Sequence, residues 1–387
     1  MSLSSRARRA FFLAAALEMI PVSVPLLDGN EEKYLAECIR TGWISSEGPF
    51  VNQFEEQFAG RIGRRFGVAV SNGSAALEAA VVALRLGPGD EVILTTFTII
   101  SCAAAIVRAG AIPVVTDCDP RTFNMTAEAV EAAITPRTRA IMVVHVYGLP
   151  VDMDAVLQIA ERHQLKIIED AAEAHGQTYK GRPCGSFGDI STFSFYANKH
   201  LTTGEGGMLV TNDENLAERC RSLRNLCFQT GKRFVHEELG WNFRMTNIQA
   251  AVGLAQLERL EEFVVRKRRM GARYNELLSD LPGLELPLER TSYAENIYWV
   301  YGVVLSEAIP FDAKEAMQRL GKLGIITRPF FWPMHEQPVL RRMGLFQGVR
   351  HPIAERIARR GFYIPSGVAL TEQQIEEVSD VMHQVFS

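Results

Sequence analysis

The stretch KIIEDAAEAHG, residues 166–176, places a short apolar strand directly before an acid and a turn. Similar apolar runs of about five residues recur along the chain and alternate with stretches of helical periodicity. This alternation is typical of a mostly parallel sheet with helices on both faces. We therefore predict an α/β fold with strands at Gly67–Val70, Glu91–Leu94, Ile112–Thr116, Ala140–His145, Lys166–Glu169, Ile190–Phe195 and Met208–Thr211.

A change in amino-acid composition after Trp241 predicts a second, smaller domain. Residues 246–278 are rich in Ala, Leu, Glu and Arg, which favours one or two long helices and a hinge. Mixed strand and helix signals from about residue 281 onward indicate a smaller C-terminal α+β domain. We place a large domain at residues 19–265 and a small domain at residues 266–387. Residues 1–18 are expected to be a disordered extension ahead of a natural start near Met19, although Arg6, Arg8, Arg9 and the apolar run after them faintly resemble a signal peptide.

The composition excludes several classes of protein. The net charge is −4 and there is no long basic run, so a nucleic-acid binder is not expected. The six cysteines form no CxxC pair and have no histidine at metal-ligand spacing, which predicts reduced thiols, no metal site and a cytoplasmic location. No apolar run reaches the roughly 20 residues that a membrane-spanning helix needs.

Polar side chains follow the predicted strands at the end where an α/β sheet binds ligands. Asp170 comes directly after the strand Lys166–Glu169, where an acid could pair with a protonated ring nitrogen or could simply cap a helix. Lys199 lies between an apolar strand and a glycine turn, where partial desolvation would lower its pKa and suit it to form an imine. The hydroxyl of Ser194 is expected to point toward the same site.

The turn 71–75, Ser-Asn-Gly-Ser-Ala, leaves a strand and starts a helix. Backbone N–H groups at such a helix start suit a phosphate, although the same residues also make an ordinary capped turn. A second polar cluster, residues 240–247, crowds the start of a long helix. Capping by Thr246 or Asn247 accounts for part of this cluster and leaves Asn242 and Arg244 unexplained.

Together these motifs resemble the DegT/DnrJ/EryC1/StrS family of sugar aminotransferases, within the fold type I group of pyridoxal 5'-phosphate enzymes. The resemblance covers roughly residue 20 to the C-terminus and rests on the segments 43–46 (WISS), 71–74 (SNGS), 169–173 (EDAAE), 193–195 (FSF) with 198–199 (NK), 203–207 (TGEGG) and 244–249 (RMTNIQ). It implies a PLP-dependent transfer of an amino group from glutamate, which leaves as 2-oxoglutarate, to a nucleotide-linked keto sugar, with a 4-keto-6-deoxy sugar preferred.

The resemblance also implies roles for individual residues. Lys199 would hold the cofactor as an imine, Asp170 would pair with the ring nitrogen, and Glu173 would lie beside the ring. The phosphate would be bound by Gly73, Ser74, Ala75 and Ser194, and Asn242 would reach in from the second subunit of a homodimer. The loop 327–335 resembles the substrate-facing loop of the family, with Arg328 and His335 as candidate substrate ligands, although an aromatic loop packed between domains is equally compatible with this sequence.

Two departures from the family pattern stand out. Ile99 occupies the position where an aromatic residue usually stacks on the cofactor ring, and Phe97 lies two residues away. Ala103 replaces a frequent Asn, so the nucleotide-sugar pocket is expected to differ. Two alternatives stay open: a sugar 3-dehydratase of the same fold, which carries His at the lysine position as His200 would after a one-residue shift, and a regulatory relative without catalysis.

Overall fold

A seven-stranded sheet forms the centre of the protein. The computed structural model describes residues 19–229, 231–232 and 234–386, so the expectation for residues 1–18 lies outside the described residues. The strand order is β1-β9-β8-β5-β4-β2-β3, and β9 runs antiparallel to both of its neighbours while the other adjacent pairs are parallel. All seven predicted strands are present, as β1 Phe66–Val70, β2 Glu91–Thr95, β3 Ile112–Thr116, β4 Thr138–Val144, β5 Lys166–Asp170, β8 Ile190–Ser194 and β9 Gly207–Thr211.

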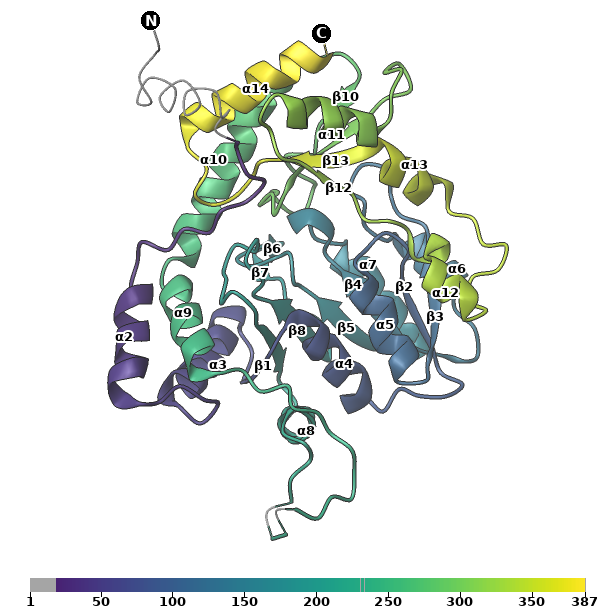
Figure 1. The fold of residues 1–387 in the computed structure, drawn as a ribbon. Helices are drawn as coiled ribbons and strands as arrows, with labels where there is room; N and C mark the ends of the chain where they lie inside the picture. The colour runs from purple at the N-terminus through teal and green to yellow at the C-terminus, as the bar shows by residue number, and fades with distance from the viewer. Residues whose placement is uncertain (1–18, 230, 233, 387) are drawn as a thin grey trace, which may run out of the picture.

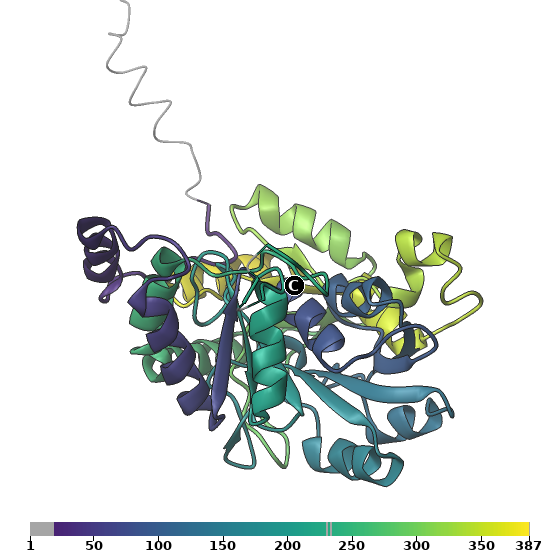
Figure 2. The same cartoon turned by 90° about the horizontal axis from the view of Figure 1, so that it is seen from below.

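Helices cover both faces of this sheet (Figures 1 and 2). Side chains alternate along each strand, so Val92 and Leu94 join the core under α4 and α5, whereas Ile93 joins the core under α6 and α7. Helices α3 and α9 pack together on the second face beside β1, β8 and β9. The helices of this part are α2 Glu31–Thr41, α3 Pro49–Ile62, α4 Gly73–Ala83, α5 Ile100–Arg108, α6 Ala127–Ala132, α7 Met153–His163, α8 Glu214–Arg224 and α9 Asn247–Leu257.

The long helix α10, Leu260–Leu278, links the two parts of the molecule (Figure 1). Its first turns contribute Leu260 and Val264 to the core beside the large sheet, and its last turns contribute Tyr274 and Leu278 to a separate core. That second core lies against a four-stranded antiparallel sheet of order β10-β11-β13-β12. The change from one core to the other falls inside this helix, so the predicted division after residue 265 stays a prediction.

The second sheet and its helices lie above the large sheet in Figure 1. Its elements are β10 Leu284–Glu285, β11 Tyr301–Leu305, α11 Ala313–Lys322, β12 Arg328–Pro329, α12 Pro338–Arg342, α13 Pro352–Arg360, β13 Gly361–Ile364 and α14 Glu372–Phe386. The described chain begins on this part, because Ile20 N donates a hydrogen bond to Gly324 O (2.9 Å) and Ser366 N donates one to Val22 O (2.9 Å). Among the described residues, no helix is both long enough and apolar enough to cross a membrane.

Candidate active site

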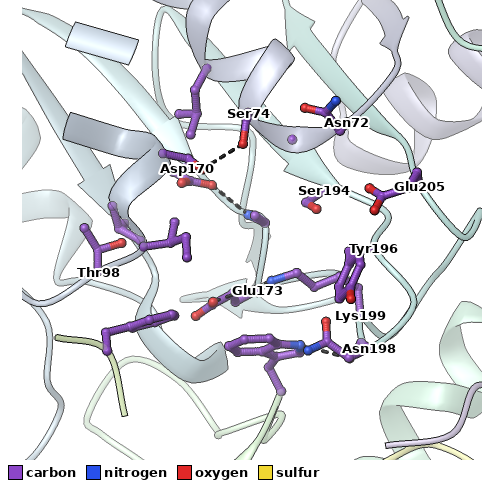
Figure 3. A pocket seen from close by; sticks show the side chains of 18 of the residues that line it. Asn72, Ser74, Thr98, Asp170, Glu173, Ser194, Tyr196, Asn198, Lys199 and Glu205 are labelled. Carbon is purple, nitrogen blue, oxygen red and sulfur yellow. Dashed lines mark hydrogen bonds and ion pairs between the residues drawn. The ribbon is translucent and has the colours of Figure 1, made fainter. Parts of the chain in front are cut away.

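A cavity of about 710 Å³ opens where β4, β5 and β8 end, at the carboxyl edge of the large sheet. Asp170 is the last residue of β5 and Ser194 is the last residue of β8, so the topology brings both to one edge. Figure 3 shows the side chains around this cavity. It is lined by Asn72, Gly73, Ser74, Leu77, Thr98, Ile99, Ser101, Arg108, Val144, Asp170, Ala172, Glu173, Ser194, Tyr196, Asn198, Lys199, Glu205, Trp299, Phe331 and Tyr363.

Asp170 forms one wall of the cavity. It is 3% exposed, and its carboxylate accepts hydrogen bonds from the backbone N–H of Ala172 (3.1 Å) and from the thiol of Cys102 (3.3 Å). Burial raises the pKa of Asp170, and the hydrogen bonds and the charge of Lys199 oppose that rise. The site therefore contains an acid that is short of hydrogen-bond donors and suited to hold a protonated ring nitrogen.

Lys199 lies on the opposite wall, and its side chain is 9% exposed. Its Nζ atom is 3.5 Å from Glu173 Oε1 and 3.8 Å from the centroid of the Trp299 ring. The indole N–H of Trp299 donates to Asn198 O (3.0 Å), which fixes the ring beneath the lysine. Burial lowers the pKa of Lys199, while the carboxylates of Glu173 and Asp170 oppose this change. A lysine in this setting loses its proton more readily than a surface lysine.

Glu173 is the carboxylate that contacts the Nζ atom of Lys199. Its Oε2 accepts the backbone N–H of Tyr147 (2.8 Å), and Tyr147 adopts the left-handed region at φ 57°. Burial raises the pKa of Glu173 to about 7, against the opposing charge of Lys199. Burial therefore favours the neutral forms of both Glu173 and Lys199, and the contact between the two side chains allows a proton to pass from one to the other.

The start of α4 forms the third wall. Asn72 caps the helix, and its Oδ1 accepts the N–H of Ala75 (2.8 Å). The first N–H groups of a helix have no acceptor within the helix, so those of Gly73 and Ser74 can bind an anion. A Cβ atom on Gly73 would lie 2.6 Å from the Cβ of Ser194, so glycine is required for these two segments to meet. Ser74 Oγ is 2.7 Å from Ser101 Oγ.

The structure brings together Gly73, Ser74, Asp170, Glu173, Ser194 and Lys199 from the predicted set, all of which line the cavity. Ala75 is buried outside the lining, and its N–H is taken by Asn72. Asn242 is exposed, pairs with Asn225 through a backbone bridge, and is not among the residues that line the cavity of its own chain.

The predicted substrate ligands occupy two different environments. Arg328 is exposed on β12 opposite Tyr363, and Tyr363 lines the cavity. His335 is fully buried outside the lining, with Nδ1 2.8 Å from Thr96 Oγ1 and Nε2 3.2 Å from Glu355 Oε1. Its ring joins the loop to Thr96, which follows β2 of the large sheet, so its placement matches the packing interpretation of the aromatic loop.

The structure also places the two residues that depart from the family pattern, Ile99 and Ala103. Ile99 lines the cavity, whereas Phe97 is completely buried in an aromatic cluster with Phe123, Tyr147 and two further rings. Phe97 therefore cannot replace the missing aromatic residue. Ala103 is completely buried in the core and is not among the residues that line the cavity.

Three residues at or near the cavity were not predicted from the sequence. Trp299 comes from the segment before β11, and Cys102 and Ser101 come from the first turn of α5. The sequence contains no local signal for Trp299, because it lies 100 positions beyond Lys199. Residue spacing could have suggested Ser101 and Cys102, since both follow the end of β2 and start a helix at the ligand-binding edge.

Comparison with known proteins identifies the family. The model of the DegT/DnrJ/EryC1/StrS aminotransferase family matches residues 25–383. The chain belongs to this family. The aminotransferase is 44% identical over 369 residues to a GDP-perosamine synthase of Caulobacter vibrioides, covering 95% of this chain and 99% of that one. It is 39% identical to a GDP-perosamine synthase of Escherichia coli O157:H7, covering 96% and 100%.

Solved structures agree with this assignment. A putative sugar aminotransferase of Streptococcus pneumoniae in its PLP form has a TM-score of 0.87 at 26% identity, covering 95% of this chain and 100% of that one. The aminotransferase is a fold type I, PLP-dependent enzyme. The residues that line the cavity fit this cofactor: the first N–H groups of α4, at Gly73 and Ser74, would hold its phosphate, the buried carboxylate of Asp170 would pair with its ring nitrogen, and the amine of Lys199 would bind it covalently. Lys199, and not the buried His200, lines the cavity.

Proposed function

We propose that this aminotransferase moves an amino group from glutamate to a nucleotide-linked 4-keto-6-deoxy sugar, in the manner of a GDP-perosamine synthase. Two relatives with that name, at 44% and 39% identity over nearly their whole length, support the substrate class. The observation that carries the proposal is the buried amine of Lys199, 3.5 Å from Glu173 in the same cavity as the buried carboxylate of Asp170.

The residues of the cavity have separate roles in this proposal. PLP, when bound, supplies the ring that accepts electron density from the substrate carbon. Lys199 holds the cofactor and then moves a proton, a task for which burial prepares it by favouring the neutral amine. Glu173 takes or returns a proton at the Nζ of Lys199, and Asp170 holds the proton of the ring nitrogen. Gly73, Ser74 and Ser194 bind the phosphate.

The test is a reaction of the purified enzyme with glutamate and a panel of GDP-, UDP- and dTDP-linked keto sugars, analysed by mass spectrometry. We expect the mass change of oxygen replaced by NH with a GDP-linked 4-keto-6-deoxy sugar, and no product with Lys199→Ala. A product that has lost water identifies the dehydratase alternative, and the absence of any product across the panel contradicts the proposal.

We further infer a homodimer in which Asn242 enters the cavity of the partner. Asn242 is exposed and is not among the residues that line the cavity of its own chain, and apolar side chains are exposed on neighbouring segments, with Leu239 at 90% and Trp43 at 50%. Mixing Lys199→Ala subunits with Asn242→Ala subunits should restore activity, because one site of each hybrid dimer has both residues intact. Equal inactivity of the mixture and of each variant contradicts a shared site.

A cytoplasmic location is part of this proposal. All six cysteines lie in the described part of the chain, and they are buried and unpaired. Free thiols in that number fit a reducing compartment. Mass spectrometry of alkylated protein from cells should find six thiols, and a disulfide contradicts the placement.

A further inference from the structure

We propose that Cys102 is a positioning residue whose thiol sets the basicity of Asp170 toward the cofactor ring. Cys102 lies in the first turn of α5, is 0% exposed, and places its Sγ atom 3.3 Å from Asp170 Oδ2. The inference rests on the proposed role of Asp170 as the partner of the ring nitrogen.

The direction of the hydrogen bond follows from the groups involved. An ionised carboxylate can only accept, so the proton between Cys102 and Asp170 belongs to the thiol. Burial and the neighbouring charge of Asp170 raise the pKa of Cys102 well above its usual value, which keeps that proton on sulfur. Thr98 Oγ1 lies 3.6 Å from the same sulfur. With the thiol proton committed to Asp170, the Thr98 hydroxyl donates to sulfur, and the three residues form one chain of donors that ends at Asp170.

The identity of the donor matters because Asp170 has few partners. Its other described donor is the Ala172 N–H at 3.1 Å, and Lys199 and His145 add favourable charge from the neighbouring elements. A thiol is a weak donor compared with a hydroxyl or an amide. It therefore fills the space beside Oδ2 and leaves most of the negative charge available for the ring nitrogen. A stronger donor at this position would compete for the same carboxylate.

The contact itself can be tested on the protein without cofactor by infrared spectroscopy of the S–H stretch. The difference between wild type and Cys102→Ala isolates the band of this thiol from those of the other five cysteines. We expect a band displaced to low frequency by its charged acceptor, and Asp170→Asn should move it to higher frequency. A band at the position of an unbonded thiol that ignores Asp170→Asn overturns the proposal.

The effect on the ring can be measured by nitrogen-15 NMR of the holoenzyme loaded with ring-labelled PLP. The measured quantity is the midpoint pH at which the ring nitrogen loses its proton. Cys102→Ala removes a donor from Asp170 and should raise this midpoint by about half a unit to one unit. Cys102→Ser keeps a donor and should leave the midpoint at or below the wild-type value. Cys220, which is completely buried in α8, provides the matched control, and Cys220→Ala should leave the midpoint unchanged.

The outcomes distinguish the proposed role of Asp170 from the proposed role of Cys102. If Asp170→Asn leaves the ring nitrogen unaffected, the proposed role of Asp170 fails. If Asp170→Asn changes the midpoint while Cys102→Ala does not, the role of Asp170 stands and the inference about Cys102 is wrong. If Cys102→Ala and Cys102→Ser raise it equally, Cys102 acts by packing alone and the inference is again wrong.

Discussion

Replacing Gly73 with alanine tests the proposed phosphate site. The added Cβ would lie 2.6 Å from the Cβ of Ser194 and 3.1 Å from its Oγ, so α4 and the end of β8 must separate. Forcing a methyl group into a packed contact costs about 1–3 kcal/mol. If this strain falls on the bound state, PLP affinity drops about five-fold to over one hundred-fold, because each 1.4 kcal/mol is about ten-fold.

The assay is a titration of apo protein with PLP, followed by its absorbance, together with urea unfolding of the apo form. Gly60→Ala is the matched control, because Gly60 lies in α3 with nothing within 4 Å of an added Cβ. This control should keep full affinity and gain about 0.5–1 kcal/mol of stability, as alanine does in a helix. Wild-type PLP affinity in Gly73→Ala would refute the reasoning, since the phosphate would then not depend on this contact.

Three further predictions concern buried titratable groups. Burial raises the pKa of Glu173 from 4.5 to about 7, so between these pH values the folded apo protein keeps a proton that the unfolded chain has lost. The free energy of unfolding should therefore fall as the pH rises from 4.5 to 7. Urea unfolding of Glu173→Gln should show a smaller fall over the same range. Burial lowers the pKa of Lys267 from 10.5 to about 7, so stability should rise between these values, and Lys267→Met should remove that rise in the same unfolding series. Trp299→Leu removes the ring face 3.8 Å from Lys199 Nζ, which should lower the pKa of Lys199 further and shift the pH profile of PLP binding to lower pH; an unchanged profile contradicts a role for that ring.

The sequence predicted the sheet and one edge of the site well because both depend on local patterns. Asp170 and Ser194 each end a strand, and parallel neighbours place their ends together, so their meeting followed from the predicted topology. The antiparallel direction of β9 was not predicted, because an apolar run reads the same in either direction. The small hairpin of β6 Thr178–Tyr179 and β7 Arg182–Pro183 was also missed, since strands of two residues carry no period.

The rest of the site depends on contacts between distant segments. Trp299 reaches Lys199 from the segment before β11, and no spacing connects the two in the sequence. For the loop 327–335 the sequence did not decide between two interpretations, because its composition suits both a substrate surface and a packed interface. His335 is turned inward by Thr96 and Glu355, which lie 239 and 20 positions away. The direction of such a side chain is decided by tertiary packing alone.

Borohydride reduction of the PLP-loaded enzyme, followed by peptide mass mapping, identifies the lysine that holds the cofactor. In the described part of the chain, burial lowers the pKa of two lysines, Lys199 in the cavity and Lys267 in α10, so both are candidates for the reaction on chemical grounds. We predict that the cofactor mass appears on the peptide that contains Lys199. Cofactor mass on Lys267, or on no lysine at all, would contradict it.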